Sequence, residues 1–188
     1  ARKGHAWDSR RWGQDDTGEI HRRMKATVRR IYEEASQCGE PDVRAKIANW
    51  AIQSECEKII RASLTLARSE AELAVLPSAF DTDPWLLNCL NGTIDLHTGR
   101  LRPHNRDDLI TRLAPVEYHP NAGYPGWQKF LDRVTDGNVA LQKYLQRIVG
   151  YSLTGDISEQ VMFILYGRGK NGKSKFLEML RLLLGDYA

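Results

Sequence analysis

An apolar run that leads into a glycine-rich loop restricts the fold of this chain more than any other feature. Residues 161–165 read VMFIL, and residues 167–174 read GRGKNGKS, which fits the pattern G-x-x-x-x-G-K-[ST]. Glycines in this pattern let backbone N–H groups turn toward phosphate oxygens, the lysine brings positive charge to the terminal phosphates, and the hydroxyl binds magnesium. The run is short enough for a strand buried on both faces. The sequence therefore predicts a strand, a phosphate-binding loop and a helix, in this order.

The helix predicted after the loop would point its N-terminus at a bound anion. Its apolar positions recur at helical spacing and are Phe176, Leu177, Leu180, Leu183 and Leu184. We expect ATP, or another nucleoside triphosphate, with Mg²⁺ as the ligand. The predicted cofactor-binding residues are Gly167, Arg168, Gly169, Lys170, Asn171, Gly172, Lys173 and Ser174. Lys173 and Ser174 are the predicted catalytic residues, with the Ser174 hydroxyl as the Mg²⁺ ligand, and a glycine-rich turn without a nucleotide is the alternative interpretation.

The composition is typical of a soluble globular protein. Of the 188 residues, 41% are hydrophobic and 27% charged, so the chain is long enough to bury a sizeable core. It has no apolar run near the roughly 18 residues of a membrane helix, and its first residues lack the apolar segment of a signal peptide. The three cysteines show no metal-binding spacing, so we expect reduced thiols in a cytoplasmic protein. The net charge of +3 permits a nucleic-acid partner without indicating one.

The front third of the chain predicts a small helical bundle. Residues 7–20, WDSRRWGQDDTGEI, suggest the tail of a hairpin, and Asp16 or Thr17 is the predicted cap of the helix that follows. The apolar positions of this helix are Ile20, Met24, Val28, Ile31 and Ala35. Further helical patterns follow from Asp42 to about Ala67, with apolar residues Val43, Ile47, Trp50, Ile59, Ile60 and Leu64.

The middle of the chain changes to short runs separated by turn signals. Asn91-Gly92 and Thr98-Gly99 are typical of hairpin turns, so three or four short strands are predicted over about 85–118. Helices are predicted again over 127–134 and 139–151, the second with an apolar face of Leu141, Tyr144, Leu145 and Ile148. The predicted fold class is α+β: an N-terminal helical bundle and a small β-hairpin region, followed by the strand, loop and helix that begin an α/β domain.

Four segments of the chain resemble a known family. They read FDTDPWLLNCLNGTIDLHTGRLRPHNRDDLITRLAPVEYHPNA, PGWQKFLDRVTDG, LQRIVGYSLTGD and VMFILYGRGKNGKSKFLEMLRLLLGDYA. In this order they are similar to the phage and plasmid primase-helicases of the satellite-phage type, which join a domain named for the poxvirus primase to a superfamily-three helicase. The resemblance runs from about Asp15 to the last residue. Lys175 departs from the Thr that is usual after the loop in that family.

The resemblance implies an ATP-driven replicative helicase that forms a hexameric ring on single-stranded DNA, in the cytoplasm of a bacterial host. It implies that residues 1–152 are a helicase-associated linker domain and that residues 153–188 are the N-terminal portion of an AAA+-like ATPase domain. Such an ATPase also needs acidic residues on a second strand, a polar sensor and an arginine from a neighbouring subunit. We expect these to lie beyond Ala188, so the chain alone is expected to show no appreciable ATPase activity.

Several basic residues are candidate DNA contacts. They are Arg22, Arg23, Arg29 and Arg30 in the first helix, and Arg100 and Arg102 in the hairpin region. Salt-dependent binding of DNA phosphates is one interpretation, and a solvated face offset by neighbouring carboxylates is the alternative. The five tryptophans can stack on bases, although core positions are favoured because their surroundings have apolar periodicity.

Other candidate groups predict structural roles. Asp81 and Asp83 have the D-x-D spacing of a metal-binding pair, but Pro84 follows at once, which favours a turn. The five histidines are scattered without ligand spacing, so surface or capping roles are expected.

Three functions remain open from the sequence. The first is a fragment of a replicative helicase that contributes a linker domain and the phosphate-binding loop. The second is a non-catalytic module of the same protein that oligomerises or binds single-stranded DNA. The third is another phosphate-loop NTPase or kinase, which is less favoured because most of the chain precedes the loop.

Overall fold

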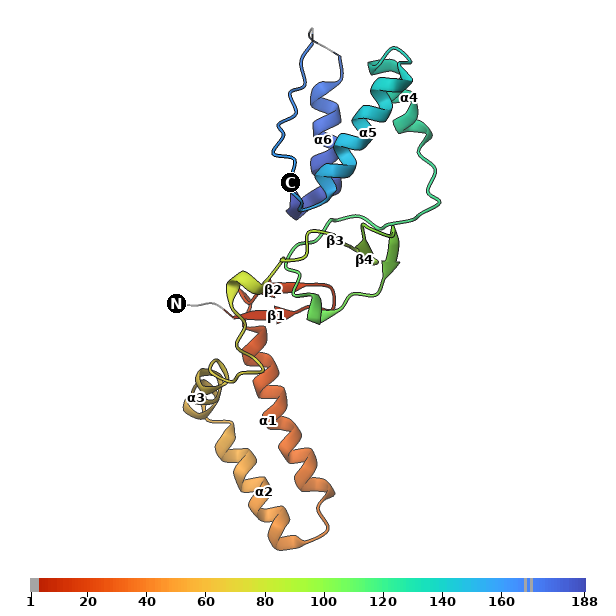
Figure 1. Cartoon of the computed structure of the whole chain (residues 1–188). Helices are drawn as coiled ribbons and strands as arrows, with labels where there is room; N and C mark the ends of the chain where they lie inside the picture. The colour runs from red at the N-terminus through yellow and green to blue at the C-terminus, as the bar shows by residue number, and fades with distance from the viewer. Residues whose placement is uncertain (1–3, 168, 170) are drawn as a thin grey trace. The chain divides into compact units, whose positions relative to one another are not determined.

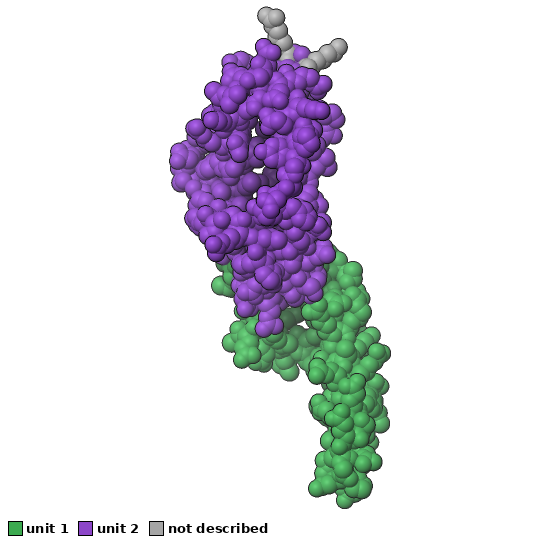
Figure 2. Space-filling view, turned by 90° about the vertical axis from the view of Figure 1, so that its right-hand side faces the viewer, with its two compact units in different colours: residues 1–6, 13–79 green, residues 7–12, 80–188 purple. Residues whose placement is uncertain are grey.

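The computed structural model describes residues 4–167, 169 and 171–188. These residues form six α-helices and five short strands in two antiparallel sheets (Figure 1), which confirms the predicted α+β class. The chain divides into two compact units (Figure 2): residues 1–6 with 13–79, and residues 7–12 with 80–188. The division at residues 152 and 153 that the family resemblance implies stays a prediction. Among the described residues no helix is both long and apolar enough to cross a membrane.

The first unit contains the predicted helical bundle. Its helices are α1 (Glu19–Gln37), α2 (Pro41–Ser54) and α3 (Glu57–Ala67), and Pro41 stands in the first turn of α2, where its missing N–H costs nothing. Helix α1 buries Val28 and Ala35, two of the positions predicted from its periodicity. Helix α3 buries Ile60. The periodicity therefore identified the inward faces of α1 and α3 correctly.

The buried face of α2 differs from the predicted one. Ala51 and Ser54 are the buried residues of this helix, whereas Trp50 is 56% exposed and Val43 is 39% exposed. Successive helical residues lie about 100° apart, so burial of Ala51 turns Trp50 outward. The small Ala51 side chain allows close approach of the neighbouring backbone, which the large indole of Trp50 would prevent.

The start of α1 corrects the predicted cap. Asp15, rather than Asp16 or Thr17, accepts hydrogen bonds from the backbone N–H groups of Glu19 at 2.7 Å and Ile20 at 2.9 Å. Gly18 precedes α1 in a left-handed backbone conformation, and it has no side chain that could cap the helix. The intervening turn therefore brings a more distant carboxylate to the exposed N–H groups of the first helical turn.

A hairpin precedes α1, as the sequence suggested. Strands β1 (His5–Trp7) and β2 (Trp12–Gln14) pair in a two-stranded sheet. In its turn, one carboxylate oxygen of Asp8 accepts from the N–H groups of Arg10 and Arg11, each at 2.8 Å. The rings of Trp7 and Trp12 lie 5.9 Å apart between centroids. The turn thus depends on an aspartate that hydrogen-bonds to the backbone ahead of it.

The second unit is built on the β3–β5 sheet. Strands β3 (Leu86–Cys89), β4 (Gly92–Asp95) and β5 (Arg100–Arg102) are antiparallel neighbours in this order. Leu90 and Asn91 form the first turn and Gly92 begins β4, one residue earlier than the predicted Asn91-Gly92 pair, while the second turn contains the predicted Thr98-Gly99. The core on this sheet contains Leu87, Cys89, Ile94 and Ala114, and Leu153 and Tyr187 pack against it from the C-terminal part of the chain. Burial raises the pKa of the Cys89 thiol.

Three α-helices and a short turn follow in the C-terminal part of the second unit. They are α4 (Pro125–Val134), α5 (Val139–Leu153), α6 (Lys173–Leu184) and the 3₁₀ turn Gly185–Tyr187, called the C-terminal turn below. Asn138 caps α5 by accepting from the N–H of Leu141 at 3.0 Å. Helices α4, α5 and α6 all occur where the sequence predicts them. On α5, Leu145 and Ile148 are half-buried, while Leu141 and Tyr144 are exposed.

The predicted strand at residues 161–165 is wrong for this structure. Residues 161–166 do not form a strand, and the side chains of Met162 and Ile164 are 81% and 71% exposed. A strand buried on both faces needs neighbouring strands to satisfy its backbone N–H and C=O groups. Among the described residues, both sheets are formed by other segments, and neither includes this run. The apolar run is therefore an irregular and largely exposed connection between α5 and the predicted phosphate loop.

Candidate functional site

The predicted phosphate loop leads directly into the N-terminus of α6. Gly172 precedes the helix in a left-handed backbone conformation with φ of 84°. The first helical hydrogen bond runs from the Phe176 N–H to the Gly172 carbonyl at 2.9 Å. Among the described residues, no side chain caps this helix start. N–H groups in a first helical turn have no acceptor within the helix, and the helix dipole adds positive potential there, so this end suits an anion.

The Lys173 side chain connects two points of the loop. Its Nζ atom donates to the Gly167 carbonyl at 3.0 Å and to Asn171 Oδ1 at 2.7 Å. The ammonium group is thereby held over the loop instead of extending into solvent, and the residue is half-buried. A charged lysine placed in this way brings a positive charge to the same end of α6 that exposes the first-turn N–H groups.

The two neighbouring lysines of α6 have different roles. Lys175 Nζ lies 2.7 Å from the carboxylate of Glu178, one helical turn ahead, and both side chains are largely exposed. The hydrogen bond from Lys175 holds the pKa of Glu178 below its usual value. Lys175 is therefore paired along the helix surface, whereas Lys173 is turned back over the loop.

The loop packs closely against α4. A Cβ atom added to Gly172 would lie 2.5 Å from Cγ1 of Val134 and 3.2 Å from the ring of Phe130, so only glycine fits here. One turn into α6, the buried Phe176 stacks on Trp127 with 5.7 Å between ring centroids. The end of the loop is thus pressed against an aromatic surface of α4. Trp127 is half-buried, which agrees only partly with the core position predicted for it.

The described groups fit a magnesium nucleotide. They include an ammonium group directed to the loop, the Ser174 side chain in the first turn of α6, and the N–H groups of that turn, which no side chain caps among the described residues. A lysine, a hydroxyl and backbone N–H groups are the donors that phosphates and Mg²⁺ use in such loops. Arg168 and Lys170 lie outside the described residues. The assignment of Gly167, Gly169, Asn171 and the other loop residues to nucleotide binding stays a prediction.

The side chains of Asp81 and Asp83 accept hydrogen bonds from different segments. Asp83 accepts from the Trp85 N–H at 2.9 Å and so fixes a local turn, as the turn interpretation predicts. Asp81 accepts from the Thr111 N–H at 2.8 Å and also from the Thr111 hydroxyl, so it joins two segments that are distant in sequence instead of forming the predicted local turn. The described residues contain no group of three or more His, Cys, Asp or Glu side chains arranged to hold a metal ion.

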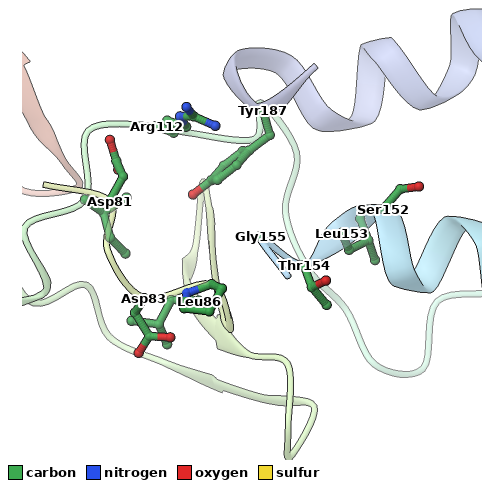
Figure 3. A pocket seen from close by; sticks show the side chains of 11 residues that line it. Asp81, Asp83, Leu86, Arg112, Ser152, Leu153, Thr154, Gly155 and Tyr187 are labelled. Atoms are coloured by element: carbon green, nitrogen blue, oxygen red, sulfur yellow. The ribbon is translucent and has the colours of Figure 1, made fainter. Parts of the chain in front are cut away.

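These aspartates line a polar pocket that the sequence did not indicate. The pocket has a volume of about 260 Å³, and Arg112, Thr154 and Tyr187 also line it (Figure 3). The Arg112 guanidinium carbon lies 5.9 Å from the centroid of the Tyr187 ring. Burial raises the pKa of Tyr187 to about 12. The residues that line the pocket come from segments far apart in the sequence, so no local sequence pattern could have identified this pocket.

The arginines proposed as DNA contacts lie in different environments. Arg22 and Arg23 both pair with Glu19, at 2.8 and 2.9 Å, and their hydrogen bonds hold the Glu19 pKa below its usual value. Arg102 makes two hydrogen bonds, of 2.8 and 2.9 Å, with the largely buried carboxylate of Asp108. The other three candidates, Arg29, Arg30 and Arg100, are exposed. DNA contact by these residues stays a prediction.

Comparison with known proteins relates the first three quarters of the chain to a described family. The family described as "D5 N terminal like" matches residues 1–136. A protein of Acanthamoeba polyphaga mimivirus named "Putative helicase" is 29% identical to the chain over 110 residues. This match covers 56% of the chain and 11% of the viral protein, so the chain corresponds to a small part of that relative. The family match includes the β3–β5 sheet and α4, and it ends before α5 and the predicted phosphate loop.

Proposed function

Because the chain belongs to the D5 N terminal like family, we propose that it is part of an ATP-dependent replicative DNA helicase of the primase-helicase type. In this proposal residues 167–174 bind the phosphates of ATP with Mg²⁺. The family region before them positions this loop and contributes to assembly of an oligomeric ring on single-stranded DNA. The name of the mimivirus relative and the resemblance of the loop to superfamily-three helicases support the proposal.

The position of Lys173 is the observation that carries the nucleotide-binding part. The ammonium group of Lys173 lies over the loop, between the Gly167 carbonyl and the Asn171 side chain. The N-terminus of α6 also points to the loop, so the helix dipole and the Lys173 charge would both attract an anion bound there. ATP would supply a transferable phosphoryl group there, and Mg²⁺ would neutralise part of its charge. Lys173 and Ser174 are the residues that would hold the phosphates and the ion.

Substitution of Lys173 tests this proposal, and substitution of Lys175, in the same turn of α6, is the matched control. The chain and its variants Lys173→Ala and Lys175→Ala are titrated with MgATP by isothermal titration calorimetry. A lost charge-assisted contact to phosphate is expected to weaken binding by at least about 10-fold in Lys173→Ala. Lys175→Ala should change the Kd by less than about 3-fold, because its ammonium group pairs with Glu178.

Binding measurements without Mg²⁺ and with single-stranded DNA distinguish between the competing functions. Removal of Mg²⁺ with EDTA is expected to weaken ATP binding to the wild-type chain, and the substitution Ser174→Ala is expected to weaken binding of MgATP. A wild-type chain that binds no MgATP, or equal losses in Lys173→Ala and Lys175→Ala, would contradict the nucleotide site. Salt-dependent binding of a single-stranded oligonucleotide without any binding of MgATP would favour the non-catalytic DNA-binding module.

A further inference from the structure

The C-terminal end of α6 is fixed to the β3–β5 sheet region by the C-terminal turn. Asp186 accepts from the Leu113 N–H at 3.1 Å and forms an ion pair with Arg11. At the start of the turn, a Cβ atom added to Gly185 would lie 2.3 Å from Pro115 Cδ and 3.1 Å from the Leu113 carbonyl oxygen, so the turn packs closely against residues 113–115. An ion pair, a hydrogen bond and close packing therefore hold the C-terminal turn in place.

Tyr187 inserts its ring into the same region. Its hydroxyl accepts from the Asn88 N–H at 3.1 Å, and its ring packs against the core formed by Leu87, Cys89, Ile94 and Ala114. Arg112 lies on the ring (Figure 3). Tyr187 is half-buried, and its withdrawal would expose the ring face that packs on the core and leave the Asn88 N–H unpaired, so it is an effective anchor.

The N-terminal end of α6 is fixed by α4. Phe176 stacks on Trp127, and Trp127 stacks on Phe130 with 5.1 Å between ring centroids. Gly172, the residue that precedes α6, contacts Val134 and Phe130 of the same helix. Trp127, Phe130 and Val134 all lie within residues 1–136, as do Arg11, Asn88 and Leu113 at the other end.

We propose that the D5 N terminal like region positions the phosphate loop by holding α6 at both ends, with Trp127 and Asp186 as positioning residues. This inference rests on the proposed nucleotide site. Helix α6 is only 12 residues long and begins with Lys173, so a shift at either end is carried along a stiff helix to the phosphate-binding groups. Misplacement of a binding group by about 1 Å can cost up to about 10²-fold in function. The region would thus be a component of the nucleotide site and not only a connecting segment.

Two substitutions release one end each. Trp127→Leu removes the aromatic stack on Phe176, and Asp186→Ala removes the ion pair with Arg11 and the hydrogen bond from Leu113. Each is expected to raise the Kd for MgATP by about 10-fold. Trp127→Phe should restore affinity to within about 3-fold of wild type, because a second aromatic ring can still stack. Trp50→Leu is the matched control, since Trp50 is largely exposed in the other unit.

Hydrogen exchange without nucleotide provides an independent readout. Amides of residues 173–184 are expected to exchange faster in Trp127→Leu and Asp186→Ala than in wild type, while those of β4 stay protected. Unchanged exchange in α6 in both variants would overturn the inference, whether or not the chain binds nucleotide. Equal acceleration in α6 and β4 would also overturn it, because that result indicates general unfolding. Failure of wild type to bind MgATP would contradict the proposed function, and the exchange data would still decide whether α6 is held.

Discussion

The His104 ring donates from Nδ1 to the Oδ1 atom of Asn88 over 2.8 Å. The direction follows from Asn88, whose amide nitrogen donates to the carbonyls of Arg10 and Arg112, each at 3.0 Å, so that its oxygen must accept. The same oxygen also accepts from the Thr93 hydroxyl at 3.1 Å. Asn88 is fully buried, and it connects the hairpin turn, the β3–β5 sheet and the loop at residue 112.

Asn88→Ala is expected to lower the free energy of unfolding by about 3 kcal/mol, because it leaves several buried donors and acceptors without partners. Asn91→Ala is the matched control in the same hairpin. Asn91 exchanges two hydrogen bonds of 2.9 Å with the backbone of Tyr118, but it is exposed, so water can replace them and the loss should be about 1 kcal/mol. Urea denaturation followed by tryptophan fluorescence measures both. Equal losses would show that the Asn88 network contributes no more than a surface turn.

The cap of α1 makes part of the stability of the first unit dependent on pH. Hydrogen bonds from the N–H groups of Ile20 and Glu19 hold the pKa of Asp15 below its usual value. The stabilisation is therefore complete above the pKa of the unfolded chain and is lost as the pH falls through the folded pKa. Asp15→Ala should unfold at a lower temperature than wild type near pH 7, and the difference should shrink below about pH 4.

Thermal unfolding followed by circular dichroism over a pH series tests the cap. Asp16→Ala is the control, since it removes the neighbouring carboxylate, which accepts from the Gln14 side chain at 3.0 Å, and leaves Asp15 in place at the N–H groups of Glu19 and Ile20. A difference between wild type and Asp15→Ala that persists unchanged at low pH would argue against an ionised cap.

The exposed apolar run should tolerate polar substitution. Met162→Ser and Ile164→Ser are each expected to change the free energy of unfolding by less than about 0.5 kcal/mol, because both side chains are largely exposed. Ile94→Ala should cost about 3 kcal/mol, since Ile94 is 5% exposed in the core of the β3–β5 sheet. Chemical denaturation of the three variants makes the comparison. A loss in Ile164→Ser as large as that in Ile94→Ala would show that the run is packed in solution.

Arginines of α1 and of β5 should respond differently in a DNA-binding assay. Arg29 and Arg30 are exposed, and neither takes part in an ion pair among the described residues, so the double Arg29→Ala/Arg30→Ala variant should reduce the salt dependence of single-stranded DNA binding. Loss of two phosphate contacts corresponds to a change of about 1.4 in the slope of log K against log salt.

Arg102→Ala should instead leave that slope unchanged and lower stability by about 1 kcal/mol, because Asp108 already engages its guanidinium group and the pair is partly exposed. Fluorescence anisotropy at several salt concentrations measures the slopes. A smaller slope of log K against log salt in Arg102→Ala, together with an unchanged slope in Arg29→Ala/Arg30→Ala, would contradict the prediction. That result would indicate that β5, and not α1, contacts the DNA.

Sequence patterns identified features that depend on neighbouring residues. The period of α1 identified Val28 and Ala35 as buried, and the Asn91-Gly92 dipeptide marked the β3–β4 turn, because helix faces and tight turns depend on local geometry. The glycine-rich motif marked the start of α6 for the same reason. The α1 cap was missed by only one or two residues, since the turn before the helix brings Asp15 to its N–H groups.

Only the tertiary structure decided which groups from distant segments meet. Phe176 stacks on Trp127, and Tyr187 accepts from Asn88, across separations of 49 and 99 residues that leave no local pattern. The strand predicted at 161–165 failed for a related reason, because an apolar run becomes a strand only where other strands pair with its backbone. The sequence by itself determined that a helix begins directly after the glycine-rich motif. Long-range packing determined that both ends of this helix are held by the family region.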